Sequence, residues 1–173
     1  MLIPNAFDAG SAKVIARQRP VAIGTSSAGI ARGLGYVDGE NISRDEMLAA
    51  VKRIVDAVDV PVTADVESGY GDAGGTAQRL LEIGVIGLNL EDADHRGGGL
   101  LSVEDACANI AAIRAVAGTG LMINARVDSW LEGATTPRSW SRAATPTWRQ
   151  ARTACSRPGS AIRRPSWIAW TDR

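Results

Sequence analysis

Three segments of the chain decide its fold: Val60-Pro-Val-Thr-Ala-Asp-Val-Glu67, Val85-Ile-Gly-Leu-Asn-Leu-Glu-Asp92 and Leu121-Met-Ile-Asn-Ala-Arg-Val-Asp128. Each begins with β-branched or aliphatic residues and ends in polar residues, and a helix-like stretch separates neighbours. Alternating strands and helices predict a parallel sheet whose strands end at one edge, where βα-repeat folds build their sites. We expect seven polar side chains to gather there: Asp65, Glu67, Asn89, Glu91, Asn124, Arg126 and Asp128.

The same alternation extends toward the N-terminus. Two further strands are expected at residues 2–8 and 21–27, the second followed by a small-residue loop at 28–39. Helical periodicity and capping signals predict helices at residues 9–17, 43–58, 76–83 and 102–116. About five βα units result, and two α/β architectures fit them: an open doubly wound sheet, or a (β/α)8 barrel cut short.

The chain divides into two parts of opposite charge. Residues 1–133 hold eleven Lys or Arg and eighteen Asp or Glu, whereas residues 134–173 hold eight Arg and one acid. The second part, which contains four of the five Trp, shows no βα pattern, and we expect it to be irregular. Two interpretations of it stay open: a basic disordered or nucleic-acid-binding arm, or out-of-frame translation of a GC-rich gene. Because the arm lacks Lys and has scattered Pro, no nucleic-acid partner is expected.

Composition excludes several classes of protein. Two cysteines do not make a disulfide framework, which favours a reducing cytoplasm. No signal-peptide pattern opens the chain and no apolar run reaches 18 residues, so no membrane partner is expected. No Gly-x-Gly-x-x-Gly fingerprint follows the first strand, which disfavours a doubly wound nucleotide-binding protein.

The polar cluster has the chemistry of a metal and carboxylate site. Asp65 and Glu67 lie two apart on one predicted strand and should face the same side. Carboxylates with waters are the ligands that Mg2+ prefers, and Arg126 suits a bidentate clamp on a carboxylate. Asn89 and Asn124 could orient substrate oxygens. The alternatives are a solvated strand end and, for Arg126, a structural ion pair.

Six segments, in order, resemble the isocitrate lyase/phosphoenolpyruvate mutase superfamily: Pro4–Ala12, Gly24–Ala31, Gly35–Glu40, Ala64–Gly71, Leu88–Asp92 and Ile123–Asp128. The resemblance implies a (β/α)8 barrel, Mg2+, a homo-oligomer, and 2-oxo or 2-hydroxy carboxylate substrates that pass through an enolate-type intermediate. It implies C–C lysis, P–C rearrangement or hydrolytic cleavage. Because only about five βα units are present, we expect an incomplete barrel, truncated after strand five.

The resemblance also assigns roles residue by residue. Asp65 matches the main Mg2+ ligand, while Glu67 and Glu91 act through metal-bound waters. Asp38 resembles the acid of a mobile loop near the metal, and it belongs to the catalytic set together with Arg126 and Glu91. The substrate carboxylate is expected at Ser26 or at the backbone N–H groups of the next two residues, Ser27 and Ala28.

The lid that lyases of this superfamily carry is different here. Their Lys-Lys-Cys-Gly or Lys-Arg-Cys-Gly motif is replaced by the segment Asp92–Leu101, which contains neither Cys nor Lys. The short segment resembles the carboxyvinyl-carboxyphosphonate phosphorylmutase-like branch. His95 could supply a proton in its place, or could simply be solvated. The alternative to an active enzyme is a catalytically inactive truncated fragment, or a half-barrel that a partner completes.

Overall fold

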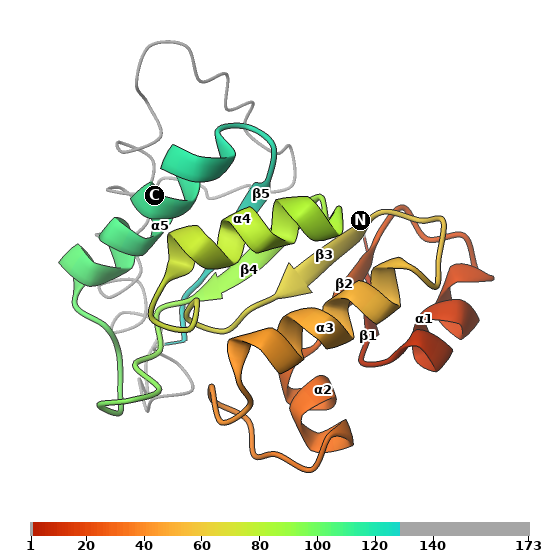
Figure 1. The fold of residues 1–173 in the computed structure, drawn as a ribbon, viewed down its shortest axis with the longest axis horizontal. Helices are drawn as coiled ribbons and strands as arrows, with labels where there is room; N and C mark the ends of the chain where they lie inside the picture. The colour runs from red at the N-terminus through yellow and green to blue at the C-terminus, as the bar shows by residue number, and fades with distance from the viewer. Residues whose placement is uncertain (1, 129–173) are drawn as a thin grey trace, which may run out of the picture.

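The computed structural model describes residues 2–128 of the 173-residue chain. These residues form a five-stranded sheet in which consecutive strands are neighbours and run parallel (Figure 1). The strands are β1 (Asn5–Ala6), β2 (Ile23–Thr25), β3 (Val62–Asp65), β4 (Gly87–Glu91) and β5 (Met122–Arg126). The predicted α/β class and parallel sheet are therefore confirmed. The interpretations of residues 134–173 lie outside the described residues.

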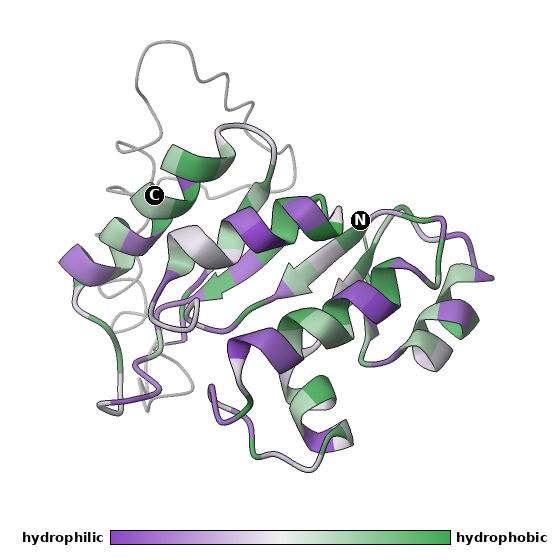
Figure 2. Ribbon diagram, viewed as in Figure 1, coloured by the Kyte–Doolittle hydropathy of each residue, from purple (hydrophilic) through white to green (hydrophobic). Residues whose placement is uncertain are grey.

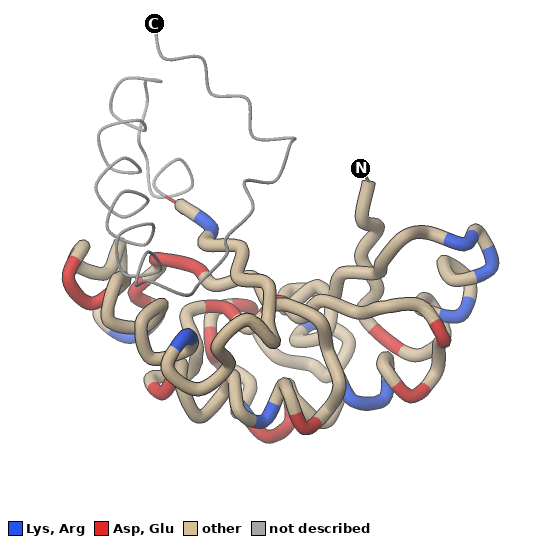
Figure 3. Tube along the Cα trace, turned by 90° about the horizontal axis from the view of Figure 1, so that it is seen from above, with Lys and Arg blue, Asp and Glu red and all other residues tan. Residues whose placement is uncertain are grey.

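Helices connect the strands and pack beside the sheet. They are α1 (Ala9–Ala16), α2 (Ser27–Gly33), α3 (Arg44–Val55), α4 (Ala73–Ile83) and α5 (Val103–Ala117). Figure 1 shows α3 and α4 in front of the strands, and α4 packs closely on α5. The helices carry a mixture of hydrophobic and hydrophilic residues (Figure 2), and residues of both charge signs occur along the helical layer (Figure 3).

The core lies between the sheet and these helices. On α3 the residues Met47, Leu48, Val51 and Ile54 are buried, as the 3.6-residue period predicts. They pack in one hydrophobic cluster with strand residues such as Leu88. Strand β3 is buried along its whole length, whereas every residue of β5 is at least partly exposed. Strand β5 pairs with β4 alone among the described strands.

The loop expected at residues 28–39 is wrong in its first half, because α2 occupies residues 27–33. Ser26 is the N-cap of this helix, and its Oγ accepts a hydrogen bond from the Gly29 N–H at 3.2 Å. A capping serine can begin a helix even where glycines lower the local helix propensity. Ile30 and Ala31 then bury the inner side of α2.

Several connections between strands and helices use positive φ values. Gly84 ends α4 with a φ of 92°, in the left-handed region that glycine adopts without strain. Glu67 and Tyr70 also have positive φ values, of 51° and 60°, in the loop after β3. Within residues 2–128, no helix is both long and apolar enough to cross a membrane.

Candidate active site

The register of the sheet brings the predicted polar residues together. Asp65 of β3 lies opposite Asn89 of β4, which lies opposite Asn124 of β5. Two residues further along, Glu91 of β4 lies opposite Arg126 of β5. Residues two apart on a strand face the same side, so the five side chains share one face at the carboxyl edge of the sheet.

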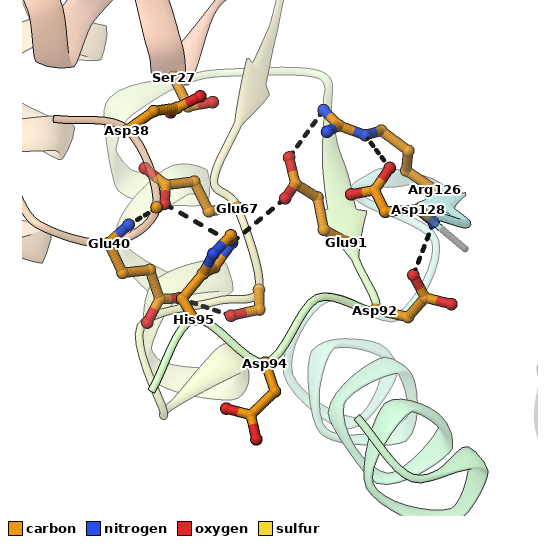
Figure 4. Close-up of polar contacts among 12 residues, drawn as sticks. Ser27, Asp38, Glu40, Glu67, Glu91, Asp92, Asp94, His95, Arg126 and Asp128 are labelled. Carbon is orange, nitrogen blue, oxygen red and sulfur yellow. Dashed lines mark hydrogen bonds and ion pairs between the residues drawn. The ribbon is translucent and has the colours of Figure 1, made fainter. Parts of the chain in front are cut away.

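Arg126 lies among three carboxylates. Its Nη1 is 2.7 Å from Glu91 Oε1 and 3.7 Å from Asp65 Oδ2, and its Nε donates to Asp128 Oδ1 at 2.7 Å. Figure 4 shows the guanidinium between Glu91 and Asp128. The structural ion pair that the sequence left open is therefore present. Burial works against the charge of Arg126, but these carboxylates raise the pKa of its guanidinium.

Three buried carboxylates surround this cation and His95. Asp65 and Glu91 are each 6% exposed and Glu67 is 1% exposed. Burial raises the pKa of all three carboxyl groups, and that of Glu91 reaches about 8 as the neighbouring charges of Asp65 and Asp128 add to the effect of burial. Burial and the neighbouring charges thus favour the protonated forms of these acids, whereas a bound cation would favour their ionised forms.

Glu67 reaches the site by a different route from the one predicted. Strand β3 ends at Asp65, so the two-residue alternation of a strand does not apply to Glu67, whose φ is positive. Its carboxylate instead accepts hydrogen bonds from the Glu40 N–H and, at 3.1 Å, from the Tyr70 hydroxyl. The contacts of the loop, rather than the pleat of the strand, orient this side chain.

The residues predicted to hold the substrate carboxylate lie at the start of α2. Ser27 and Ala28 occupy its first turn, where backbone N–H groups have no partner inside the helix. Ser27 Oγ also donates to Asp65 Oδ2 at 3.2 Å, which joins this turn to the carboxylate cluster. The hydroxyl of Ser26 is engaged as the helix cap.

Asp38 is exposed in the turn before α3. It is close enough to Glu67 for its charge to raise the pKa of that carboxyl group further, beyond the larger effect of burial (Figure 4). Asn124 Nδ2 donates to Asn89 Oδ1 at 2.9 Å, so the two predicted substrate-orienting amides bond to each other across β4 and β5.

His95 belongs to the site, against the interpretation that it is solvated. Its side chain is 19% exposed, and its Nε2 lies 3.2 Å from Glu91 Oε2 and 3.8 Å from Glu67 Oε2. The loop that carries it is closed by an antiparallel bridge between Ala93 and Leu100. Because a lone histidine in a glycine-rich segment has no periodic signal, the sequence alone left its position open.

Sequence reasoning missed three residues that support the cluster. Glu40 Oε1 accepts from Ser68 Oγ at 2.8 Å and from the Tyr70 N–H at 2.6 Å, which ties two loops together. Asp92 Oδ1 accepts from the Asp128 N–H at 2.8 Å and fixes the end of β5. Tyr70 holds Glu67, as described above. Each lies within or beside a segment that resembles the superfamily. That resemblance was the signal in the sequence from which a role in the site could have been predicted.

The donor set fits a hard divalent cation. Among residues 2–128, no three His, Cys, Asp or Glu side chains converge as direct ligands of a metal ion. Mg2+ does not require this, because it commonly binds one or two carboxylates directly and keeps several waters. Three buried carboxyl groups supply oxygen donors that a bound cation would keep ionised, so Asp65 as a direct ligand, with Glu67 and Glu91 reached through water, is chemically consistent.

These features define a class of protein: a parallel β/α scaffold with an acidic site at the carboxyl ends of its strands. The model of the phosphoenolpyruvate phosphomutase family matches residues 1–146 of the chain. The chain therefore belongs to this family, within the phosphoenolpyruvate mutase/isocitrate lyase superfamily.

Solved structures and curated relatives agree with this placement. A protein from Burkholderia cenocepacia J2315, provisionally assigned as a phosphonomutase, is 40% identical with a TM-score of 0.82, over 88% of this chain and 65% of that chain. A 2,3-dimethylmalate lyase structure is 26% identical with a TM-score of 0.74, over 88% and 54% of the two chains. The 2-methylisocitrate lyase of Halalkalibacterium halodurans C-125 is 32% identical over 137 residues, which are 73% of this chain and 45% of that protein. The chain spans about half the length of the curated relatives it matches.

Proposed function

We propose that the chain carries the site of a Mg2+-dependent enzyme of the lyase or phosphonomutase type, acting on 2-oxo or 2-hydroxy carboxylates. The observation that carries the proposal is the group of three buried carboxylates, Asp65, Glu67 and Glu91, around Arg126 and His95 at the carboxyl edge of the sheet. A site that binds both a divalent cation and a carboxylate substrate needs this combination of buried acid and guanidinium. Membership of the family supports the reaction class.

Different residues of the chain have different proposed roles in binding the substrate and the cation. Arg126 holds its carboxylate partners through Nε and Nη1, and its planar guanidinium carries further N–H donors that could bind a substrate oxygen. The first-turn N–H groups of Ser27 and Ala28 receive the substrate carboxylate. Asp65, Glu67 and Glu91 would hold the cation, and Asp38 lies near Glu67 in the turn before α3.

Bound Mg2+ would polarise the 2-oxo group and stabilise negative charge that develops on an enolate-type intermediate. The supporting contacts keep the acids in place without reorganisation. Ser27 holds Asp65, Tyr70 and the Glu40 N–H hold Glu67, and His95 contacts Glu91. Preorganised groups of this kind lower the barrier because they need not move when charge develops.

Substrate cleavage tests this proposal. The full chain with Mg2+ is incubated with 2,3-dimethylmalate or 2-methylisocitrate, which release pyruvate when the C–C bond beside the hydroxyl-bearing carbon breaks. Phosphonopyruvate tests the P–C branch by its conversion to phosphoenolpyruvate. We expect turnover of at least one of these substrates, abolished by chelation and by Asp65→Asn, and kept by Arg53→Gln on the exposed side of α3. Conversion of none of them by a folded chain would contradict the proposal.

A second proposal has its own support in the exposure of β5. Within the described residues β1 and β5 are edges of the sheet, and Met122 on β5 is 43% exposed. Open edges offer unpaired backbone groups to another chain. A catalytically inactive fragment, or a half-barrel that a partner completes, would show this edge. Sedimentation velocity distinguishes them: a discrete dimer supports completion by a second copy, and an inactive monomer supports the fragment.

A further inference from the structure

Glu40 contacts the loop after β3 twice, through its backbone and through its side chain. Its N–H donates to Glu67 Oε2, and its Oε1 accepts from the Ser68 hydroxyl at 2.8 Å and from the Tyr70 N–H at 2.6 Å. Tyr70 in turn donates its hydroxyl to Glu67 Oε1 at 3.1 Å. Glu40, Glu67 and Tyr70 are therefore joined in a closed ring of hydrogen bonds, in which each oxygen of the Glu67 carboxylate has a protein donor. Figure 4 shows Glu40 beside Glu67.

The backbone of this ring adopts a conformation that residues with side chains rarely adopt. The φ values of Glu40, Glu67 and Tyr70 are 54°, 51° and 60°. Such conformations persist only where surrounding contacts hold them in place. The side chain of Glu40 supplies two of these contacts to the loop after β3, so the conformation of the loop depends on it.

The same residue attaches the turn that carries Asp38. Asn41 Nδ2 closes this turn locally, since it donates to the carbonyls of Asp38 and Gly39 at 2.9 and 3.2 Å. Burial is the main cause of the raised pKa of Glu67, and the negative charge of Asp38 raises that pKa further. The two acids therefore repel each other when both are ionised, and the bonds of Glu40 hold the turn and the loop together against this repulsion.

We infer that Glu40 is a positioning residue of the cation site, whose side chain sets the orientation of Glu67 and the place of the turn that carries Asp38. The inference rests on the proposed function, in which Glu67 reaches the cation through a bound water. A carboxylate in that role must point at the water, so the groups that orient it contribute to metal affinity although they do not contact the metal.

Three substitutions of Glu40 separate the reach of its side chain from its charge. Glu40→Gln keeps an acceptor oxygen at the same reach and loses the charge. Glu40→Asp keeps the charge and is one methylene shorter, and Glu40→Ala loses both. A side chain that acts as a hydrogen-bond acceptor is replaced by Gln but not by Asp or Ala, whereas a direct cation ligand would depend on the charge that Gln lacks.

Binding of Mn2+ to the full chain, followed by electron paramagnetic resonance of the free ion, tests the inference. Mn2+ stands in for Mg2+ because both favour carboxylate and water ligands. We expect Glu40→Ala and Glu40→Asp to raise the Kd roughly tenfold, and Glu40→Gln to stay within about threefold of wild type. Asp65→Asn, which replaces the proposed direct ligand, should abolish binding. Gly84→Ala strains the end of α4, at the opposite edge of the sheet, and should leave the Kd unchanged, so it controls for lost stability.

The outcomes separate this inference from the proposed function. An unchanged Kd in Glu40→Ala, or an equal loss in Glu40→Gln and Glu40→Ala, overturns the inference and leaves the proposed site standing. A loss in Gly84→Ala as large as that in Glu40→Ala also overturns it, because lowered stability alone would then weaken binding. If the folded wild-type chain binds no Mn2+, or if binding survives in Asp65→Asn, both the inference and the proposed function are overturned.

Discussion

Replacement of Arg126 by glutamine measures how much the guanidinium contributes to stability by offsetting the cost of burying the neighbouring carboxylate charges. Removing one partner of a fully buried ion pair costs about 3–5 kcal/mol, because the other charge stays buried. Arg126 has two carboxylate contacts at 2.7 Å, but its side chain is 37% exposed, so solvent screens part of the interaction. We therefore expect Arg126→Gln to lower the free energy of unfolding by about 1.5–2.5 kcal/mol.

Urea denaturation followed by far-UV circular dichroism is the assay, with Arg53→Gln as an exposed control expected to change stability by less than about 0.5 kcal/mol. The double variant Arg126→Gln/Glu91→Gln should be more stable than Arg126→Gln alone, since it removes a carboxylate left without its partner. A loss in Arg126→Gln no larger than that of the control would refute the reasoning. So would a double variant whose losses simply add.

Three further predictions concern the loops and caps around the site. Ser43 and Tyr36 hydroxyls lower the pKa of Glu46, so its contribution to stability is complete above its ordinary value of 4.5 and disappears as pH falls through the depressed value. Glu46→Gln should therefore be less stable than wild type at pH 7 and equal to it near pH 2; a constant difference across that range would count against the assignment. Gly84→Ala should cost about 1–2 kcal/mol in urea denaturation, purely from the positive φ, because nothing lies within 4 Å of the added Cβ; a neutral result would show that the helix end relaxes. Tyr70→Phe should cost about 1–2 kcal/mol, because the carboxylate of Glu67 loses a partly buried donor; an unchanged stability would mean that water replaces the hydroxyl.

Most of the fold could be predicted from the sequence, because apolar residues recur every 2 residues in a strand and every 3.6 residues in a helix, and the two patterns are easily told apart. The apolar spacing of α3 and the polar endings of β3, β4 and β5 placed the elements within a few residues and predicted which side chains gather at the carboxyl edge. Residues 27–33 were misread, since the cap that starts α2 is a single serine followed by residues of mixed helix propensity. The hydrogen bond of one capping serine starts helix α2, and the periodicity of apolar residues does not reveal such a bond.

The positions of candidate site residues on strands could be predicted from strand register. The positions of those on loops could not. Asp65, Glu91 and Arg126 follow from register alone. The orientation of Glu67, the approach of His95 and the role of Glu40 depend on contacts between loops far apart in the sequence. Such contacts are set by tertiary packing, so no pattern within one segment could reveal them.

Thermal unfolding of the full chain, with Mg2+ and oxalate added singly and together, tests the central claim most directly. Oxalate mimics an enolpyruvate, and a site that needs both cation and carboxylate binds it well only when Mg2+ is present. At a hundredfold excess over Kd the two ligands together should stabilise the native state by about 2.7 kcal/mol, which raises Tm by roughly 5–10 °C, more than the sum of their separate effects. A cooperative transition whose Tm does not move with both ligands would contradict the assignment of this cluster as a Mg2+-dependent carboxylate site.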